Sequence, residues 1–292
     1  MYDVIIVGRG PAGISASLYT IRAGLNTLVI YNGWGNLEKA GNIQNYYGTE
    51  PDKSGMEILK NGVYQAKSLN VGFAEDEVVG LLSSDEIQIN GIKDTYRSKS
   101  LILAMGAPKR KPPFNNMGKF EGNGISFCGT CDGFFYRNKK IAVVGYNEYM
   151  YHEAMELAGM TDNITILTNG MDVDVSKERL GELDRFDISD EKIKGFYGDE
   201  ALKGIEFNSG KREEFDGVFI AYGSATGMEM AMKSGLLTEN GKIMVDGDMK
   251  TNIPNIFAAG DCTGGFRQIA VAVGEGASAA KSAIEYIRSL KH

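Results

Sequence analysis

The sequence predicts an α/β protein, because short apolar strands alternate with amphipathic helices along most of the chain. Two segments follow the order strand, glycine turn, helix, strand: residues 3–31 and residues 140–167. Such βαβ units build parallel sheets with helices packed on them. We therefore expect two Rossmann-like three-layer domains, the second inserted in the first. The expected division assigns residues 1–112 and 246–292 to one domain and residues 113–245 to the other.

The first βαβ unit is the clearest segment of the chain. DVIIV (3–7) is a continuous apolar run typical of a buried strand, and the turn GRGPAG (8–13) follows it. ISASLYTIRAG (14–24) has helical periodicity and ends at Gly24, a residue typical of a helix C-terminus. NTLVIY (26–31) then predicts the second strand.

The later elements are weaker but regular. The second βαβ unit begins with the strand Ile141–Val144, which leads into Gly145, and ends with the strand NITIL (163–167). The other expected elements are a helix within 32–68, short strands within 71–104, a loop at 105–126, strands within 187–221, short strands within 242–260 and an Ala-rich helix from about Val271 to Leu290.

The composition limits the classes of function. The chain has 292 residues, is 43% hydrophobic and carries a net charge of −7, which argues against a general nucleic-acid binder. Its apolar runs are too short to span a membrane, and its start, MYDVIIVGRG, lacks the basic region of a signal peptide. We therefore expect a cytoplasmic protein with no nucleic-acid and no membrane partner. Three cysteines and two histidines suit neither a disulfide scaffold nor a zinc site.

Gly8, Gly10 and Gly13 form the pattern G-x-G-x-x-G between a strand and a helix. The first glycine allows the tight turn, the second lets the backbone approach a pyrophosphate, and the third allows close packing of helix on strand. The helix N-terminus then presents N–H groups to the phosphates. The acid expected at the end of the second strand for the ribose hydroxyls is absent, because Tyr31 and Asn32 stand there. Either Asn32 holds the ribose or the adenosine end is bound differently.

Cys128 and Cys131 form a C-x-x-C pair, and Asp132 follows directly. This spacing suits a reversible disulfide in which one thiolate attacks and the other resolves. A carboxyl group beside the second sulfur has the chemistry to move protons when the disulfide opens. The alternatives are half of a metal site or two unrelated thiols. The dinucleotide turn in the same chain favours the redox interpretation.

The chain resembles the low-molecular-weight thioredoxin reductases of the pyridine nucleotide-disulfide oxidoreductase superfamily. The resemblance lies in G-x-G-P-A-G at the start, C-x-x-C-D-G-F-F in the middle, and IFAAGDC with RQIAVAVGEGASAA near the end. It implies a homodimeric flavoprotein that reduces thioredoxin. In such an enzyme Cys131 would face the flavin, Cys128 would attack the thioredoxin disulfide, and Asp132 would be the acid/base group.

The resemblance also implies where non-covalent FAD would bind. The turn at Gly8–Gly13 would hold the pyrophosphate, Gly260 and Asp261 would lie at the ribityl and phosphate end, and Asn45, Arg267 and Gln268 would lie near the flavin ring. The remaining residues assigned to FAD are Pro11, Ala12, Tyr31, Asn32, Val78, Ala104, Gly106 and Ile269.

The second glycine turn departs from the family. There the related reductases carry a second glycine fingerprint and a His-Arg-Arg segment for NADPH, whereas here only Gly145 remains and Tyr146, Asn147 and Glu148 follow it. Thr168-Asn169-Gly170 stands in place of the arginines, and carboxylates nearby would repel a phosphate. We therefore expect no NADPH site. A ferredoxin-dependent group of flavin thioredoxin reductases has this character, and the sequence resembles it.

Reduced ferredoxin or flavodoxin is accordingly the expected electron donor. Lys109-Arg110-Lys111 is either an ordinary solvated loop or, as the first place to look for one, a docking cluster for an acidic carrier. The alternatives are a dithiol oxidase that uses FAD and oxygen, a reductase that binds NADH or NADPH in an altered way, and a flavin-binding regulatory protein without turnover. Cys262 follows Asp261, and a lone cysteine is most often a buried structural thiol; a third redox group is the alternative.

Overall fold

The structure is a computed structural model that describes residues 1–83, 86–106, 114–127, 129–222, 231, 234–239 and 241–290, with only the backbone described at 130 and 131. The chain forms two compact units, Met1–Lys109 with Thr226–His292, and Arg110–Ala225. The expected division assigned residues 226–245 to the second domain, but they group with the first. The reason is that Leu236 and Ile243 are buried against its sheet.

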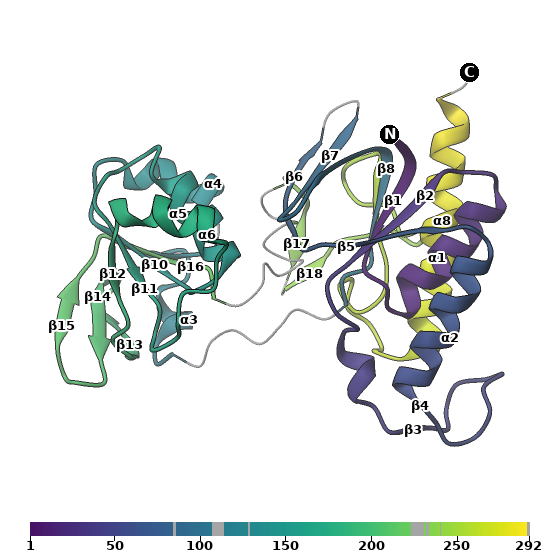
Figure 1. Ribbon diagram of the computed structural model, residues 1–292, viewed down its shortest axis with the longest axis horizontal. Coiled ribbons are helices and arrows are strands. Elements are labelled where there is room, and N and C mark those ends of the chain that lie inside the picture. The colour runs from purple at the N-terminus through teal and green to yellow at the C-terminus, as the bar shows by residue number, and fades with distance from the viewer. Residues whose placement is uncertain are drawn as a thin grey trace. The chain divides into compact units, whose positions relative to one another are not determined.

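The first unit is built on a seven-stranded sheet in the order β5–β2–β1–β8–β7–β6, with β19 paired to β8 (Figure 1). The pairings of β5, β2, β1, β8 and β19 are parallel, whereas β8, β7 and β6 run antiparallel. The strands are β1 (Tyr2–Val7), β2 (Thr27–Tyr31), β5 (Gly72–Glu75), β6 (Val78–Ser83), β7 (Ile87–Gly91), β8 (Thr95–Leu103) and β19 (Ile256–Ala258).

Three helices cover one face of this sheet, α1 (Pro11–Arg22), α2 (Gly55–Ser68) and α8 (Ile269–Ser289) (Figure 1). Helix α1 packs on both of the others, and its contact with α8 is close because a Cβ at Gly276 would lie 2.2 Å from the carbonyl oxygen of Ala12. The small residues Ala279, Ala280 and Ala283 are fully buried in the same layer. The Ala-rich composition of the last helix therefore reflects tight helix packing.

The period-2 alternation of β1 separates the two faces of the sheet. Val4 and Ile6 join the helical layer, whereas Ile5 and Val7 join a second apolar cluster with residues of β6, β7 and the 231–243 segment. The short elements of this unit are η1 (Asn36–Lys39), β3 (Asn42–Ile43), β4 (Lys53–Ser54), β17 (Thr238–Glu239) and β18 (Lys242–Ile243). Ser54 and Glu57 form a capping box that fixes the start of α2.

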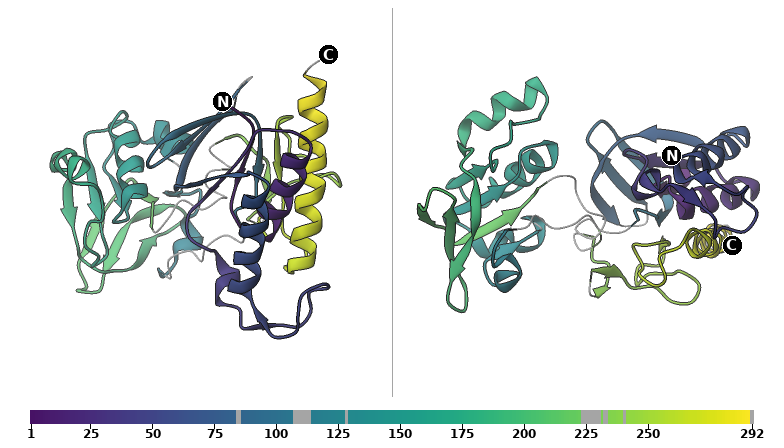
Figure 2. Two further views of the ribbon diagram at one scale, coloured as in Figure 1. Left: turned by 45° about the vertical axis from the view of Figure 1, so that its right-hand side comes forward. Right: turned by 90° about the horizontal axis from the view of Figure 1, so that it is seen from below.

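The second unit carries a five-stranded sheet in the order β12–β11–β10–β16–β9, with every pairing parallel. Its strands are β9 (Ile125–Ser126), β10 (Ile141–Val144), β11 (Ile164–Leu167), β12 (Asp187–Ser189) and β16 (Gly217–Ile220). An antiparallel sheet of β13 (Ile193–Gly198), β14 (Leu202–Phe207) and β15 (Arg212–Glu214) belongs to the same unit (Figure 2).

Alternate residues of β10 again divide the core. Ile141 and Val143 pack with helix α5 (Glu148–Leu157), whereas Ala142 and Val144 pack with residues of the antiparallel sheet. The other helices of this unit are α3 (Met117–Phe120), α4 (Gly129–Asp132), η2 (Gly133–Tyr136), α6 (Lys177–Glu182) and η3 (Leu183–Arg185). The region expected to be loop at 105–126 thus contains α3 and β9, because Met117, Phe120 and Ile125 are buried apolar residues.

Among the residues that the structure describes, we find no helix with both the length and the apolarity needed to span a bilayer.

Candidate active site

The turn between β1 and α1 uses its glycines in different ways. Gly8 has φ +112°, and a Cβ there would lie 2.2 Å from the carbonyl oxygen of Ala104. A Cβ at Gly13 would lie 1.8 Å from the carbonyl oxygen of Gly8. By contrast, a Cβ at Gly10 would meet no atom within 4 Å. Gly8 and Gly13 are therefore required by packing, whereas Gly10 leaves the backbone open to a ligand, which is what a pyrophosphate needs.

The first turn of α1 is suited to an anion. Gly10 is the N-cap without a side-chain cap, Pro11 is the first helical residue, and the first turn contains no acidic side chain. The N-terminal end of the helix dipole therefore faces the open backbone of Gly10 without a competing carboxylate from its own first turn. The residues present fit the phosphates of a dinucleotide.

The turn after β19 packs against the same end of α1. Gly260 has φ +82°, and a Cβ there would lie 3.0 Å from the Cβ of Ala12. The N–H of Gly260 donates to the Glu275 carboxylate at 2.7 Å, and the Thr263 hydroxyl donates to the same carboxylate at 3.1 Å. Glu275 was not predicted as a site residue. It belongs to α8 and ties that helix to the glycine turn that precedes Asp261.

Asn45 and Gln268 come together although 223 residues separate them in the sequence. The Asn45 amide Nδ2 donates to the Gln268 side-chain oxygen at 2.8 Å, and Gln268 is the N-cap of α8. Arg267 is exposed and Ile269 is the first residue of the helix. The residues assigned to the flavin-ring end are therefore neighbours around one helix N-terminus.

The end of β2 is organised by residues that the sequence motifs did not reveal. The Arg9 guanidinium lies 3.7 Å from the ring centroid of Tyr31 and 3.6 Å from that of Trp34. The Asn32 amide donates to the Glu77 carboxylate at 2.7 Å. The predicted residues Val78 and Ala104 are buried, and Gly106 has φ +75°.

The dithiol segment is described only in part. Cys128 lies outside the described residues, as do Lys109, Arg110 and Lys111, and the side chain of Cys131 is not described. Asp132 is described, and its carboxylate accepts a hydrogen bond from the Ser126 hydroxyl at 2.6 Å. Burial, together with the negative charge of Asp132, raises the pKa of Tyr136. Asp132 is therefore an acceptor with a defined partner beside the C-x-x-C segment.

Helix α4, which contains Cys131, is anchored to α5. The buried Glu153 carboxylate accepts a hydrogen bond from the N–H of Gly129 at 2.8 Å. A Cβ at Gly129 would lie 3.0 Å from that carboxylate, and a Cβ at Gly133 would lie 3.0 Å from the Leu157 side chain. A larger residue at either position would press on these side chains, so the two glycines favour the close contact of α4 with α5. Neither Glu153 nor Ser126 carried a local sequence signal, because each acts on a residue distant in the chain or in another element.

The second glycine turn is covered by its own chain. Glu148 is the first residue of α5; its carboxylate forms an ion pair with Arg179 and accepts a hydrogen bond from the N–H of Ser176 at 2.8 Å. The N–H of Asp174 donates to the carbonyl oxygen of Tyr146 at 2.6 Å. The Tyr146 ring packs edge-on against Tyr222, with 5.3 Å between ring centroids. Residues 174–176 thus lie against the N-terminal end of α5.

The family follows from the length of the match. A family model described as pyridine nucleotide-disulphide oxidoreductase matches residues 2–276. The chain belongs to this family. The thioredoxin reductase of Aquifex aeolicus is 32% identical over 310 residues, an alignment that covers 100% of this chain and 95% of that protein. These matches confirm the resemblance to the thioredoxin reductases that the sequence motifs indicated.

Two crystal structures have similar folds. The atypical thioredoxin reductase TRi from Desulfovibrio vulgaris Hildenborough has a TM-score of 0.93 and 37% identity, and the match covers 99% of each chain. A ferredoxin-flavin thioredoxin reductase from Clostridium acetobutylicum has a TM-score of 0.71 and 29% identity over 99% of this chain and 98% of that one. The predicted fold class, α/β with two Rossmann-like domains, is confirmed.

Cys262 of this oxidoreductase is a buried thiol. Its Sγ donates to the carbonyl oxygens of Ala259 at 3.3 Å and Leu103 at 3.4 Å. Burial raises the pKa of Cys262 to about 12, so the thiol stays protonated at neutral pH. A protonated, buried thiol is a poor nucleophile, which favours the structural interpretation.

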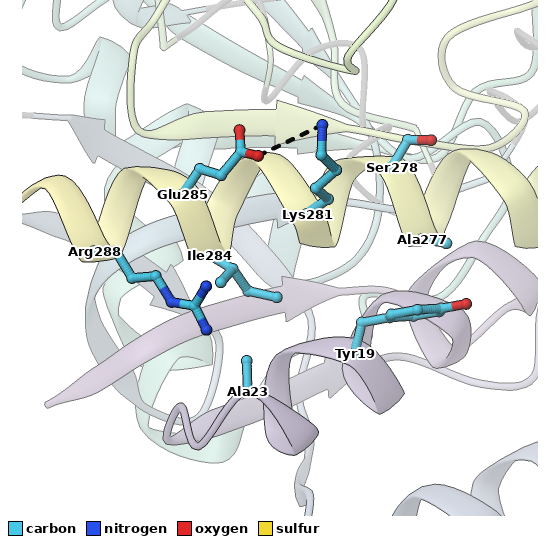
Figure 3. A pocket seen from close by; sticks show the side chains of 8 residues that line it. All are labelled: Tyr19, Ala23, Ala277, Ser278, Lys281, Ile284, Glu285 and Arg288. Carbon is cyan, nitrogen blue, oxygen red and sulfur yellow. Dashed lines mark ion pairs between the residues drawn. The ribbon is translucent and has the colours of Figure 1, made fainter.

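A pocket of this oxidoreductase lies between α1 and α8 (Figure 3). Its lining includes Tyr19 and Ala23 from the α1 end and Lys281, Ile284, Glu285 and Arg288 from α8. Lys281 and Glu285 form an ion pair of 3.5 Å. The lining contains no predicted site residue and no cysteine. No group of three or more potential metal ligands occurs among the described residues.

Proposed function

We propose that this protein is an FAD-dependent thioredoxin-disulfide reductase that receives electrons from reduced ferredoxin or flavodoxin and does not use NADPH. The observation that carries the proposal is the ion pair of Glu148 with Arg179 at the N-terminal end of α5. In a dinucleotide site that end of the helix receives the pyrophosphate. Here the first turn of the helix itself carries a carboxylate, Glu148.

The charges at the second turn oppose a nicotinamide nucleotide. Glu148 would repel a phosphate at the helix N-terminus, and its partner Arg179 is already engaged. Asn169, which stands in the segment aligned with the phosphate-binding arginines, has its side-chain oxygen occupied by the N–H of Ile193 at 2.8 Å. Tyr146 and Asn147 carry side chains where the related reductases have glycines. Asp174 also forms a β-bridge with Asn147. Each of these contacts occupies a position, or pairs a charged group, that NADPH binding would require.

By contrast, the glycine turn between β1 and α1 suits a bound dinucleotide. Its open Gly10 and its acid-free helix start support FAD binding in the first unit. The similarity to a protein described as a ferredoxin-flavin thioredoxin reductase supports a one-electron carrier as the donor. A turn of the FAD-binding type, a C-x-x-C-Asp segment and a second turn without its glycines occur together in one chain.

The chain's own residues would perform the following work. The Gly8–Gly13 turn would bind the pyrophosphate, while Asn45 and Gln268, which are hydrogen-bonded, would orient the ring end. Bound FAD supplies the conversion of single electrons into a pair delivered to a disulfide. Once the Cys128–Cys131 disulfide is reduced, the Cys128 thiolate attacks the thioredoxin disulfide, and Cys131 resolves the mixed disulfide. Asp132, held by Ser126, would accept and return the thiol proton.

The associated expectations are a cytoplasmic location, a homodimer and docking of the acidic carrier at Lys109-Arg110-Lys111. A charge-reversed variant of the three basic residues should slow reduction by ferredoxin and leave thioredoxin reduction from dithionite-reduced enzyme unchanged.

The deciding experiment is anaerobic reduction of the purified holoenzyme. The flavin absorbance is followed after adding reduced ferredoxin, NADPH or NADH, each with and without thioredoxin. Bleaching by ferredoxin with formation of reduced thioredoxin supports the proposal, whereas equally fast bleaching by NADPH overturns the donor assignment. Fast reoxidation by air with a thiol substrate, and no reduction of thioredoxin, would instead indicate the dithiol oxidase.

A further inference from the structure

The end of β2 lacks the acid that usually binds the adenosine ribose, but a carboxylate is present at the same place. The Asn32 amide, at the position of the missing acid, donates to the Glu77 carboxylate at 2.7 Å. Glu77 follows β5, and β5 pairs in parallel with β2 so that Glu75 is opposite Tyr31. We propose that Glu77 is the residue that accepts the ribose hydroxyls of FAD. This inference rests on the proposed FAD binding.

The chain around Glu77 is held rigidly by the buried Asp76. The Asp76 carboxylate accepts hydrogen bonds from the N–H groups of Glu77 at 2.8 Å, Lys93 at 3.0 Å and Asp94 at 3.1 Å. It also accepts one from the Tyr96 hydroxyl at 3.0 Å. A carboxylate with this many donors fixes the loop in one conformation.

The backbone attaches the same corner to β2. The N–H of Asp76 donates to the carbonyl oxygen of Tyr31 at 2.9 Å, and the N–H of Ile92 donates to the carbonyl oxygen of Glu77 at 2.9 Å. A Cβ at Gly91 would lie 2.0 Å from the Asp76 carboxylate, so the corner closes only with glycine there. The position of Glu77 relative to the end of β2 is therefore determined by the fold and not by a flexible loop.

Arg9 fixes the other side of the contact. It stands between Gly8 and Gly10, and its Nε donates to the carbonyl oxygen of Gly33 at 2.9 Å. Its guanidinium also lies over the rings of Tyr31 and Trp34. These contacts bracket Asn32 in the sequence. The pyrophosphate turn, Asn32 and Glu77 thus form one preorganised group at the carboxyl edge of the sheet.

The chemistry of this group matches a ribose diol. A carboxylate has two oxygens and accepts hydrogen bonds only, which suits two neighbouring hydroxyl donors. The amide of Asn32 orients the Glu77 carboxylate, and hydrogen bonds to an ionised acceptor are stronger than neutral ones. Glu77 should therefore distinguish FAD from its analogue that lacks the 2′-hydroxyl of the adenosine ribose.

The test is the dissociation constant of the apoprotein for these two flavins. Trp34, the single tryptophan, contacts Arg9 and provides a fluorescence signal at this end of the site. The wild type should bind FAD about tenfold more tightly than 2′-deoxyadenosine FAD, in line with one hydrogen bond to a charged group. Glu77→Gln should bind FAD about tenfold more weakly and lose this preference. The control Glu75→Gln removes the same charge two residues away and should behave as the wild type.

A double variant separates recognition from structure. Asn32→Asp combined with Glu77→Gln exchanges the acid and the amide, and it should restore FAD affinity and the preference for the 2′-hydroxyl. If Glu77→Gln weakens both flavins equally, or changes neither, the assignment of Glu77 is overturned. If the wild-type apoprotein binds no FAD, the proposed function fails first, and this outcome is distinguishable from failure at Glu77.

Discussion

The Glu148 carboxylate forms an ion pair with Arg179 at the N-terminal end of α5, with side-chain exposures of 19% and 25%. The helix start that a second dinucleotide would use is therefore neutralised from within the protein. In the first unit the corresponding helix start, at Gly10 and Pro11, has no acid in its first turn. The two βαβ units thus share an architecture but differ in the charge at the helix start that follows the glycine turn.

Glu148→Gln should lower the free energy of unfolding by about 1–2 kcal/mol, because a half-buried ion pair and a favourable helix-end charge are lost together. Urea unfolding followed by circular dichroism measures the change. Asp199→Asn removes one partner of the exposed Lys203–Asp199 pair in the same unit and is the matched control, with little expected effect.

The same Glu148→Gln variant should not gain reduction by NADPH, since Tyr146, Asn147 and the 174–176 segment still cover the turn. Stopped-flow bleaching of the flavin by NADPH tests this. If the variant were reduced by NADPH as fast as by ferredoxin, a single charge would be the whole barrier and the covering segment would be irrelevant.

Gly10→Ala and Gly13→Ala should separate cofactor binding from folding. A methyl group at Gly10 meets no protein atom within 4 Å, so the variant should fold normally but bind FAD at least about tenfold more weakly. A methyl group at Gly13 would lie 1.8 Å from the Gly8 carbonyl oxygen, so that variant should lose several kcal/mol of stability, on the order of 3 or more.

Flavin absorbance per protein and the melting temperature of each apoprotein distinguish the two effects. The expectation is contradicted if Gly10→Ala melts as low as Gly13→Ala, because Gly10 would then be required for packing. It is equally contradicted if Gly10→Ala retains wild-type FAD affinity.

The parts of the fold that can be predicted from the sequence are those marked by patterns among neighbouring residues. The Gly8–Gly13 turn and the two βαβ units are visible in the sequence because spacing and periodicity are properties of neighbouring residues. The sequence did not point to Glu77, Arg9 or Glu153, because each of them contacts residues in other elements. Glu77 accepts a hydrogen bond from Asn32, 45 residues away in the sequence, and Glu153 accepts one from Gly129, 24 residues away. No pattern in a single window encodes such contacts.

The boundary between the two domains is another feature that local sequence patterns do not reveal. Residues 226–245 have no strong helical or strand periodicity, so no local pattern joins them to the first domain, yet Leu236 and Ile243 are buried there. Burial between segments far apart in the chain is a tertiary property, and only the fold reveals it.

Tyr96→Phe should cost about 1–2 kcal/mol, because it removes one hydrogen bond to the buried Asp76 carboxylate. Burial and the contact with Asp76 raise the pKa of Tyr96 to about 12. The folded protein therefore holds the phenol proton more tightly than the unfolded chain. This contribution is complete below about pH 10 and is lost as the pH rises from about 10 towards 12.

Urea titrations at several pH values between about 8 and 12 measure this effect. The alkaline loss of stability should be smaller in Tyr96→Phe than in the wild type. Tyr64→Phe changes an exposed tyrosine of the same unit and should leave the pH profile unchanged. Identical profiles for wild type and Tyr96→Phe would show that Tyr96 does not titrate differently in the folded protein.

Cys262→Ala should leave the rate of thioredoxin reduction within about twofold of the wild type, because a buried thiol with its pKa raised to about 12 supplies no thiolate near neutral pH. In the reduced native enzyme, alkylation between about pH 7 and 9 should modify Cys128 and Cys131 and spare Cys262, which should react only after unfolding. Mass spectrometry of the alkylated peptides measures each site. Rapid native labelling of Cys262, together with a large loss of turnover in Cys262→Ala, would instead make it a third redox group beside the C-x-x-C pair.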